Sequence, residues 1–166
     1  YGADVTYAVS GGTFTADLPE EYIASSRYFY PTGTSYAVGT RAAAQTAGAY
    51  IFVGNKVYND LQKAVDDIPG SEEQVEITFR PLNSVQCDDD VIIKNGQNIR
   101  FYLRYKNVTL LGSVTVQAGA NLEIYSTSNS SVGQEGNLYN IINYGTLSCS
   151  TGDRYIKVDN HGEFTF

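Results

Sequence analysis

The densest group of ionisable side chains in this sequence is the acidic run Asp88–Asp90. Carboxylate oxygens are the ligands that Ca²⁺ prefers, so a weakly bound calcium ion is one hypothesis for this run. Adjacent residues on a strand point to opposite faces, however, and three consecutive carboxylates cannot converge on one ion unless the chain turns there. We favour a solvated turn, and the sequence predicts no metal site.

The only histidine is His161, and Asp159 precedes it at a spacing that can place both side chains on one face. Ser148 and Ser150 lie in the preceding segment, which is too little to define a nucleophile–base–acid triad. No glycine-rich stretch leads into the Lys-Ser/Thr pair of a phosphate-binding loop. The sequence therefore predicts an ordinary turn histidine, no catalytic residue, no cofactor and no enzymatic activity.

Three tyrosines of the second half, Tyr102, Tyr105 and Tyr125, are candidates for contact with a glycan. Exposed aromatic rings can stack against sugar rings and often mark contact surfaces. Packing in the core and at strand edges is the favoured interpretation, and sugar binding is the alternative. Asn107 and Asn129 each begin an Asn-x-Ser/Thr glycosylation pattern, and Asn129 is the better candidate because its surroundings are polar.

The composition is acidic and rich in residues that favour strands and turns. The chain has 166 residues, a formal net charge of −7, 14 tyrosines, and neither Trp nor Met. This charge argues against binding to nucleic acid or to an anionic membrane surface. No apolar run is long enough to span a bilayer, so no membrane insertion is predicted. Abundant Tyr, Thr, Ser, Asn and Gly favour an extracellular or cell-surface β protein.

Two cysteines, Cys87 and Cys149, are too few for a disulfide scaffold. Each lies in a strand-like context, which favours a small buried hydrophobic side chain over a reactive thiol. A bond between them requires that their segments stack in the right register, and we expect buried thiols instead.

One phrase recurs four times after residue 90: β-forming residues, a turn with glycine, and an alternating apolar/polar run. A phrase that returns at about the length of one β-coil is typical of a solenoid, whose stacked coils bury a continuous core. The fold class predicted is therefore all-β, a parallel β-helix. The separations of the turn glycines are uneven, which fits a β-helix with variable turns; these glycines are Gly96, Gly119, Gly145 and Gly162.

Helical spacing of Leu61, Ala64, Val65 and Ile68 predicts an amphipathic helix at about 59–68, just before the first coil. Such a helix can cover the open edge of that coil with its apolar face. Asn59 or Asp60 is its expected N-cap.

Small residues at 39–49 favour a linker over a short helix, and make this segment the predicted boundary between units 1–48 and 49–166. The expected first unit holds a short helix near 17–24 and two strands around a Pro-Thr-Gly turn. The polar segment 126–137 is predicted to be a loop that leaves the solenoid.

Two segments carry a family resemblance. The segment 51–65 combines a strand, a Gly turn, a Tyr and a helix, and resembles the entry of a β-helix module. The segment 9–17, together with Glu21-Tyr22-Ile23, resembles the last coil and exit cap of such a module. Both are similar to surface proteins of gut-type bacteria that carry right-handed, pectate-lyase-like β-helices. The resemblance implies a right-handed coil, but the same fold serves lyases, adhesins and inert stalks.

The order of these segments is unusual, because the exit-like piece comes first and the last phrase reaches Phe166 without a cap. We expect either a segment of a longer tandem array or a subunit whose last coil stacks on the first strands of the next copy. The second interpretation is favoured: a head-to-tail homopolymer acting as a filament, stalk or surface-layer element. An adhesive module that binds a surface polysaccharide is the alternative. The expected assembly edges are Val5, Tyr7, Val9, Thr13, Phe14 and Thr15 on one side, and Ile156, Val158, Phe164 and Phe166 on the other.

Overall fold

The computed structural model describes residues 8–103, 108–126, 131–150 and 155–166. Within these ranges the chain is mostly β, with short helices only. The elements in chain order are β1 (Gly12–Phe14), η1 (Glu20–Tyr22), β2 (Tyr28–Thr32), β3 (Ser35–Gly39), α1 (Arg41–Thr46), β4 (Ile51–Val53), β5 (Lys56–Tyr58), α2 (Leu61–Asp66), β6 (Val75–Phe79), β7 (Val85–Cys87), β8 (Val91–Ile93), β9 (Asn98–Leu103), β10 (Val108–Leu110), β11 (Ser113–Val116), β12 (Asn121–Ser126), β13 (Ser131–Val132), β14 (Tyr139–Asn143), β15 (Thr146–Ser150), β16 (Ile156–Asn160) and β17 (Glu163–Thr165).

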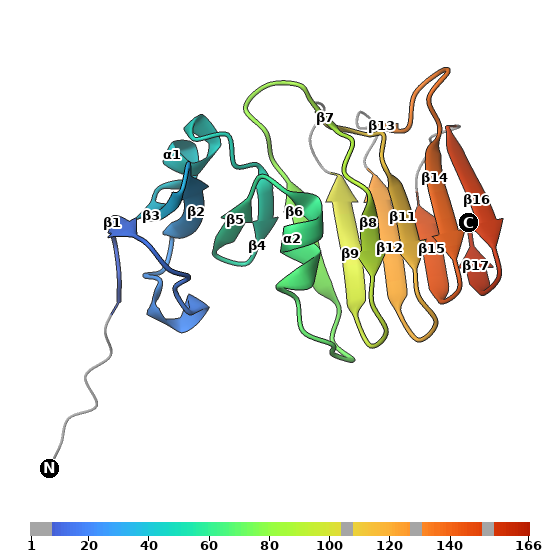
Figure 1. Cartoon of the computed structure of the whole chain (residues 1–166), viewed down its shortest axis with the longest axis horizontal. Coiled ribbons are helices and arrows are strands. Elements are labelled where there is room, and N and C mark those ends of the chain that lie inside the picture. Colours follow the sequence, from blue (N-terminus) through green and yellow to red (C-terminus); the bar gives the residue numbers. More distant parts are fainter. Residues whose placement is uncertain (1–7, 104–107, 127–130, 151–154) are drawn as a thin grey trace, which may run out of the picture.

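From β6 onward the chain winds into a β-solenoid of about five turns, as predicted from the recurring phrase (Figure 1). Strands β6, β9, β12, β15 and β17 stack in parallel as one side of the coils. Strands β8, β11, β14 and β16 form a second parallel side, and β7, β10 and β13 form a third. The first three coils visit these three sides in turn, so residues distant in sequence become stacked neighbours.

Alternation along the strands separates an inward from an outward face. In β9, Ile99, Phe101 and Leu103 are fully buried, whereas Arg100 and Tyr102 stay partly exposed. The strand period of two residues requires this, since successive side chains leave opposite faces of the sheet. Columns of inward residues, such as Ile77, Phe101 and Ile124, build the single continuous core that runs through the coils.

The repeated glycines perform two different tasks. Gly96 and Gly119 adopt φ angles of 82° and 77°, which a residue with a side chain rarely takes. Gly145 and Gly162 have no such angle; a Cβ on Gly145 would collide with the carbonyl oxygen of Ala120, and one on Gly162 with that of Gly145. These two glycines therefore permit close stacking of coils. Strand register places them in one column with earlier corner residues, in the order Gln97, Ala120, Gly145 and Gly162.

The first part of the chain extends the long sheet by antiparallel hairpins. β2 and β3 form the predicted hairpin around the Pro-Thr-Gly turn, and β4 and β5 form the next one. β1 pairs with β3, β2 pairs with β5, and β4 joins the solenoid by pairing with β6. The result is one ten-stranded sheet in the order β1-β3-β2-β5-β4-β6-β9-β12-β15-β17. The division into units 1–48 and 49–166 stays a prediction.

The expected linker at 39–49 is wrong, because its centre forms helix α1. Thr40 caps the helix by accepting a hydrogen bond from the Ala43 amide at 3.2 Å. Ala44 is fully buried, and the Gln45 side-chain amide donates to the Arg80 carbonyl at 2.7 Å. Small side chains here serve close packing against the sheet rather than flexibility.

Two further expectations need correction. The short helix near 17–24 is only the 3-10 turn η1, after which Ile23 forms a β-bridge with Val9. The loop expected at 126–137 contains β13, whose Val132 is fully buried and pairs in register with Leu110. The polar residues around it conceal a strand too short to show alternation.

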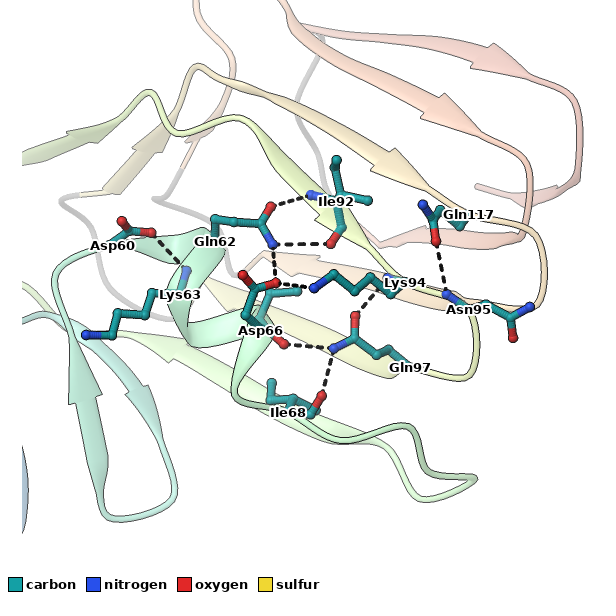
Figure 2. Close-up of polar contacts among 11 residues, drawn as sticks. Asp60, Gln62, Lys63, Asp66, Ile68, Ile92, Lys94, Asn95, Gln97 and Gln117 are labelled. Carbon is teal, nitrogen blue, oxygen red and sulfur yellow. Dashed lines mark hydrogen bonds and ion pairs between the residues drawn. The ribbon is translucent and has the colours of Figure 1, made fainter. Parts of the chain in front are cut away.

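Helix α2 lies against β8 and is joined to it by side-chain hydrogen bonds (Figure 2). Asp60 is its N-cap and accepts from the Lys63 amide at 2.9 Å. Gln62 accepts from the Ile92 amide at 2.7 Å, and Asp66 pairs with Lys94 at 2.8 Å. Leu61, Ala64 and Val65 of the same helix are buried in the solenoid core.

Candidate functional site

Strands β1 and β17 are the two outermost strands of the ten-stranded sheet, and they lie at opposite ends of the molecule (Figure 1). Among the described residues, β1 pairs only with β3, and β17 pairs only with β15. An outer strand presents a row of backbone donors and acceptors that can template another strand. These two edges are the candidate functional site.

The two outer strands run in the same direction. β1 reaches β2 through two antiparallel pairings, and β2 is parallel to β5. β5 reaches β6 through two more antiparallel pairings, and every later pairing up to β17 is parallel. An even number of reversals leaves β1 parallel to β17, so β17 of one molecule can meet β1 of another as one more parallel pair.

β17 presents apolar side chains at inward positions. Phe164 is in register with Leu147, a residue of the buried column, and Phe166 is two residues further along. With no coil above them in the described chain, Phe164 is 38% exposed and Phe166 is 75% exposed. Their rings pack edge to face with centroids 6.1 Å apart. Among the described residues, nothing covers the solenoid core at this end.

β16 is the matching outer strand of the second side. Ile156 and Val158 pair in register with the buried Tyr139 and Ile141 of β14. Both are partly buried and pack against the main core cluster. These two predicted edge residues therefore lie at the same end of the molecule as Phe164 and Phe166.

The opposite edge is built around Phe14. Phe14 is in register with Tyr36 of β3, and β3 is in register with β2. This pairing puts Phe14 on the inward face of the sheet, where the centroid of its ring lies 6.3 Å from that of Phe29. Thr13 in β1 and Thr15 just after it are exposed. Val9 lies outside the strands and forms a single parallel bridge with Ile23. The predicted edge residues Val5 and Tyr7 lie outside the described residues.

Buried amide side chains mark the corners between sides, and the sequence patterns above did not single them out. Asn143 is fully buried; its Nδ2 donates to Asn160 Oδ1 at 2.7 Å and to the Glu163 carbonyl at 2.8 Å. Gln97 Nε2 donates to the Val65 and Ile68 carbonyls at 2.8 and 2.7 Å (its bond to Ile68 is drawn in Figure 2). A detectable signal existed for the first pair: Asn143 and Asn160 each stand two residues before a corner glycine.

Tyr102 and Tyr125 come together as stacked outward neighbours in adjacent coils. Their ring centroids are 5.4 Å apart, and Tyr125 is 38% exposed. The outward row beside them holds Arg100, whose Nε donates to Glu123 at 2.8 Å. The third predicted contact, Tyr105, and the glycosylation candidates Asn107 and Asn129 lie outside the described residues.

The acidic run links β7 to β8, and its carboxylates serve different elements. Asp89 accepts from the Leu61 amide at 2.9 Å. Asp90 accepts from the hydroxyl and amide of Ser113 at 2.6 and 2.8 Å, and these bonds lower its pKa.

His161 pairs with Asp159 at 3.1 Å. Across the described ranges, no three His, Cys, Asp or Glu side chains are grouped so that they can hold a metal ion.

Both cysteines are free and buried, as expected. Burial raises the pKa of the Cys87 thiol to about 12, and the Asp89 carboxylate adds to the effect. Burial alone raises the pKa of the Cys149 thiol to about 12. At neutral pH both thiols are therefore protonated, which makes them poor nucleophiles.

Comparisons with family models, with curated proteins and with solved structures give no match to this chain. In the part of the chain that the structure describes, no helix is long and apolar enough to cross a bilayer.

Proposed function

We propose that this chain is a non-enzymatic extracellular subunit that associates end to end, with β17 of one copy pairing with β1 of the next. The product is a filament, a stalk or an element of a surface layer. One observation carries the proposal: the two outer strands of a single sheet are parallel to each other. A copy translated along the solenoid axis therefore continues the sheet without reversing its direction.

Side-chain chemistry at the two edges supports this pairing. Phe164 and Phe14 lie on the same inward face, and β17 and β1 share the phrase Gly-x-Phe-Thr. Contact between these edges covers Phe164 and Phe166 with the apolar cluster of Phe14 and Phe29. Backbone hydrogen bonds give such strand additions affinity, and the buried side chains give them register.

Helix α2 supports growth at β1 rather than at the first coil. The Gln62 side chain accepts from the Ile92 amide in β8 and donates to the Ile92 carbonyl. In this proposal, α2 therefore acts as the cap of that coil. The coil is taken as right-handed, because crossovers between parallel strands of one sheet almost always are. A bacterial cell surface is the setting that this architecture fits under the same proposal.

Two substitutions test the proposal. Phe164→Asp combined with Phe166→Asp places charges where the core must continue, and end-to-end association should be abolished. Thr165→Asp is the matched control, since it adds a charge on the outward side of the same strand. The measurement is negative-stain electron microscopy with sedimentation velocity across a concentration series. Monomeric wild-type protein at all concentrations, or filaments in the Phe164/Phe166 variant, would contradict the proposal.

A second candidate function, an adhesive module that binds a surface polysaccharide, is favoured by the pair of outward tyrosines. Tyr102 and Tyr125 form a short aromatic row beside Arg100 and Glu123, which offer hydrogen bonds to hydroxyl groups. On a glycan array, replacement of both tyrosines by Ala should remove binding. Replacement of Tyr144 by Ala should not, because this exposed tyrosine lies at the corner between β14 and β15. Absence of binding by the wild-type chain excludes this function for the glycans on the array.

A further inference from the structure

Asn143 and Asn160 form a ladder of side-chain amides at the corner that precedes the long sheet. Asn160, its second member, is exposed. Asn143 Oδ1 accepts from the Gly145 amide at 3.1 Å, and its Nδ2 donates forward to the next coil at two points, Asn160 Oδ1 and the Glu163 carbonyl. Asn160 occupies the equivalent place one coil later. Its Nδ2 donates to the Gly162 carbonyl at 3.0 Å. That nitrogen carries a second hydrogen, which can be donated to a further coil.

We infer that Asn160 fixes the register of the end-to-end junction by donating the second hydrogen of its Nδ2 to Ser10 Oγ of the next copy. This inference rests on the proposed function. Ser10 stands two residues before Gly12, just as Asn143 and Asn160 stand two residues before Gly145 and Gly162. Ser10 is exposed, and its hydroxyl can accept the bond that Asn160 Oδ1 accepts one coil earlier.

The corner glycines give independent support for the same register. Gly145 stacks so closely on Ala120, and Gly162 on Gly145, that neither position has room for a Cβ. A coil that stacks as closely above Gly162 has no room for a side chain there, and the shared phrase supplies Gly12 at that place, with a φ of 123° that Gly145 and Gly162 do not share. The register that follows pairs Gly162 with Gly12, Phe164 with Phe14, and Thr165 with Thr15.

A shift of one residue would turn every side chain of the added strand to the other face, and Phe14 would leave the core. A shift of two residues would keep the faces but would place a residue with a side chain over Gly162. The alternation of side chains alone permits a register shift of two residues between β17 and β1. The amide ladder and the column of corner glycines disfavour that shift.

Cross-linking between copies reads the register directly. Chains with Thr165→Cys are mixed with chains that carry Thr15→Cys, and oxidised. Paired residues of neighbouring strands lie within the span of a disulfide, whereas residues two positions apart lie beyond it. A cross-linked dimer should form with Thr15→Cys but not with Thr13→Cys, and wild-type chains give the background of Cys87 and Cys149.

Replacement of Asn160 by Ala should weaken association about tenfold, the effect of one buried hydrogen bond. Ser10→Ala should have a similar effect, and the double variant should be little worse than either single one. Asn140→Ala is the matched control, since among the described residues its side chain bonds only to the Leu138 carbonyl nearby.

The outcomes separate the inference from the function on which it rests. Filaments that cross-link through Thr13→Cys, or that are indifferent to Asn160→Ala, leave end-to-end assembly intact and overturn the register. Wild-type chains that do not associate at all overturn both.

Discussion

The solenoid coils and the N-terminal strands share one sheet, yet they are stabilised in different ways. In the coils, the inward residues of three sides meet, and one core cluster runs from Ile51 to Cys149. The N-terminal strands are hairpins with a separate small cluster on each face. Phe29 and Val38 form one with Ile23, and Tyr30 and Phe52 form the other under helix α1.

This difference shows what closure of the coil contributes. A parallel strand in a coil has its inward face enclosed on all sides, so each inward residue contacts others from the coils before and after it. A hairpin strand has to divide its apolar residues between two faces. The N-terminal strands therefore gain less from each buried side chain.

The largest expected effect comes from a truncation in the shared core. Phe101 is fully buried and packs edge to face on Phe79 at 5.9 Å. Phe101→Ala should lower the free energy of unfolding by about 3–5 kcal/mol. Phe29→Ala in the N-terminal cluster should cost less. Urea denaturation followed by circular dichroism measures both, and equal losses would mean that the N-terminal cluster stabilises the chain through Phe29 as strongly as the coils do through Phe101.

A methyl group at a corner glycine should have the next largest effect. Gly145→Ala forces a Cβ against the backbone of the preceding coil, and should cost about 3 kcal/mol through coil separation. Gly33→Ala meets no atom nearby and only strains a φ of 64°, at about 1 kcal/mol. Thermal unfolding of both variants compares the two uses of glycine. A larger loss at Gly33 would refute the stacking argument.

Loss of the amide at Gln97 should release helix α2. Its Nε2 satisfies the carbonyls of Val65 and Ile68 near the end of that helix, so Gln97→Ala should cost about 2 kcal/mol. Hydrogen exchange should rise first in α2. Gln117→Ala is the control, because in the described part of the chain the Gln117 side chain accepts only one long bond, of 3.3 Å, from the Asn95 amide. Equal exchange in the two variants would mean that Gln97 does not hold the helix.

The smallest expected effect is the loss of stability at acidic pH through protonation of Asp66. Hydrogen bonding to Lys94 lowers the pKa of Asp66. Because its folded-state pKa lies below its unfolded value, its stabilising contribution is complete above about pH 4 and is lost as the pH falls through the folded value. The pair is exposed, so the contribution is about 0.2–1 kcal/mol. The difference in urea midpoint between wild type and Asp66→Asn should shrink from pH 7 to pH 2. A constant difference would exclude linkage through Asp66.

Local signals predicted the elements with marked periodicity. The alternating run at 99–103 produced strand β9, and the Asp60 cap began α2. Signals failed where tertiary packing decides. The small residues at 41–46 form a helix because the sheet accommodates Ala44, and Val132 joins a strand because Leu110 lies beside it.

The sequence by itself determined that the chain winds into coils, because a recurring period-two phrase can bury its apolar residues only by stacking. Only the tertiary structure decided that β1 and β17 share a sheet and a direction, because that relation depends on every pairing between them. The partners of Gln97 and Asn143 were likewise decided by the fold, since a buried amide bonds to whichever backbone the coils bring within reach.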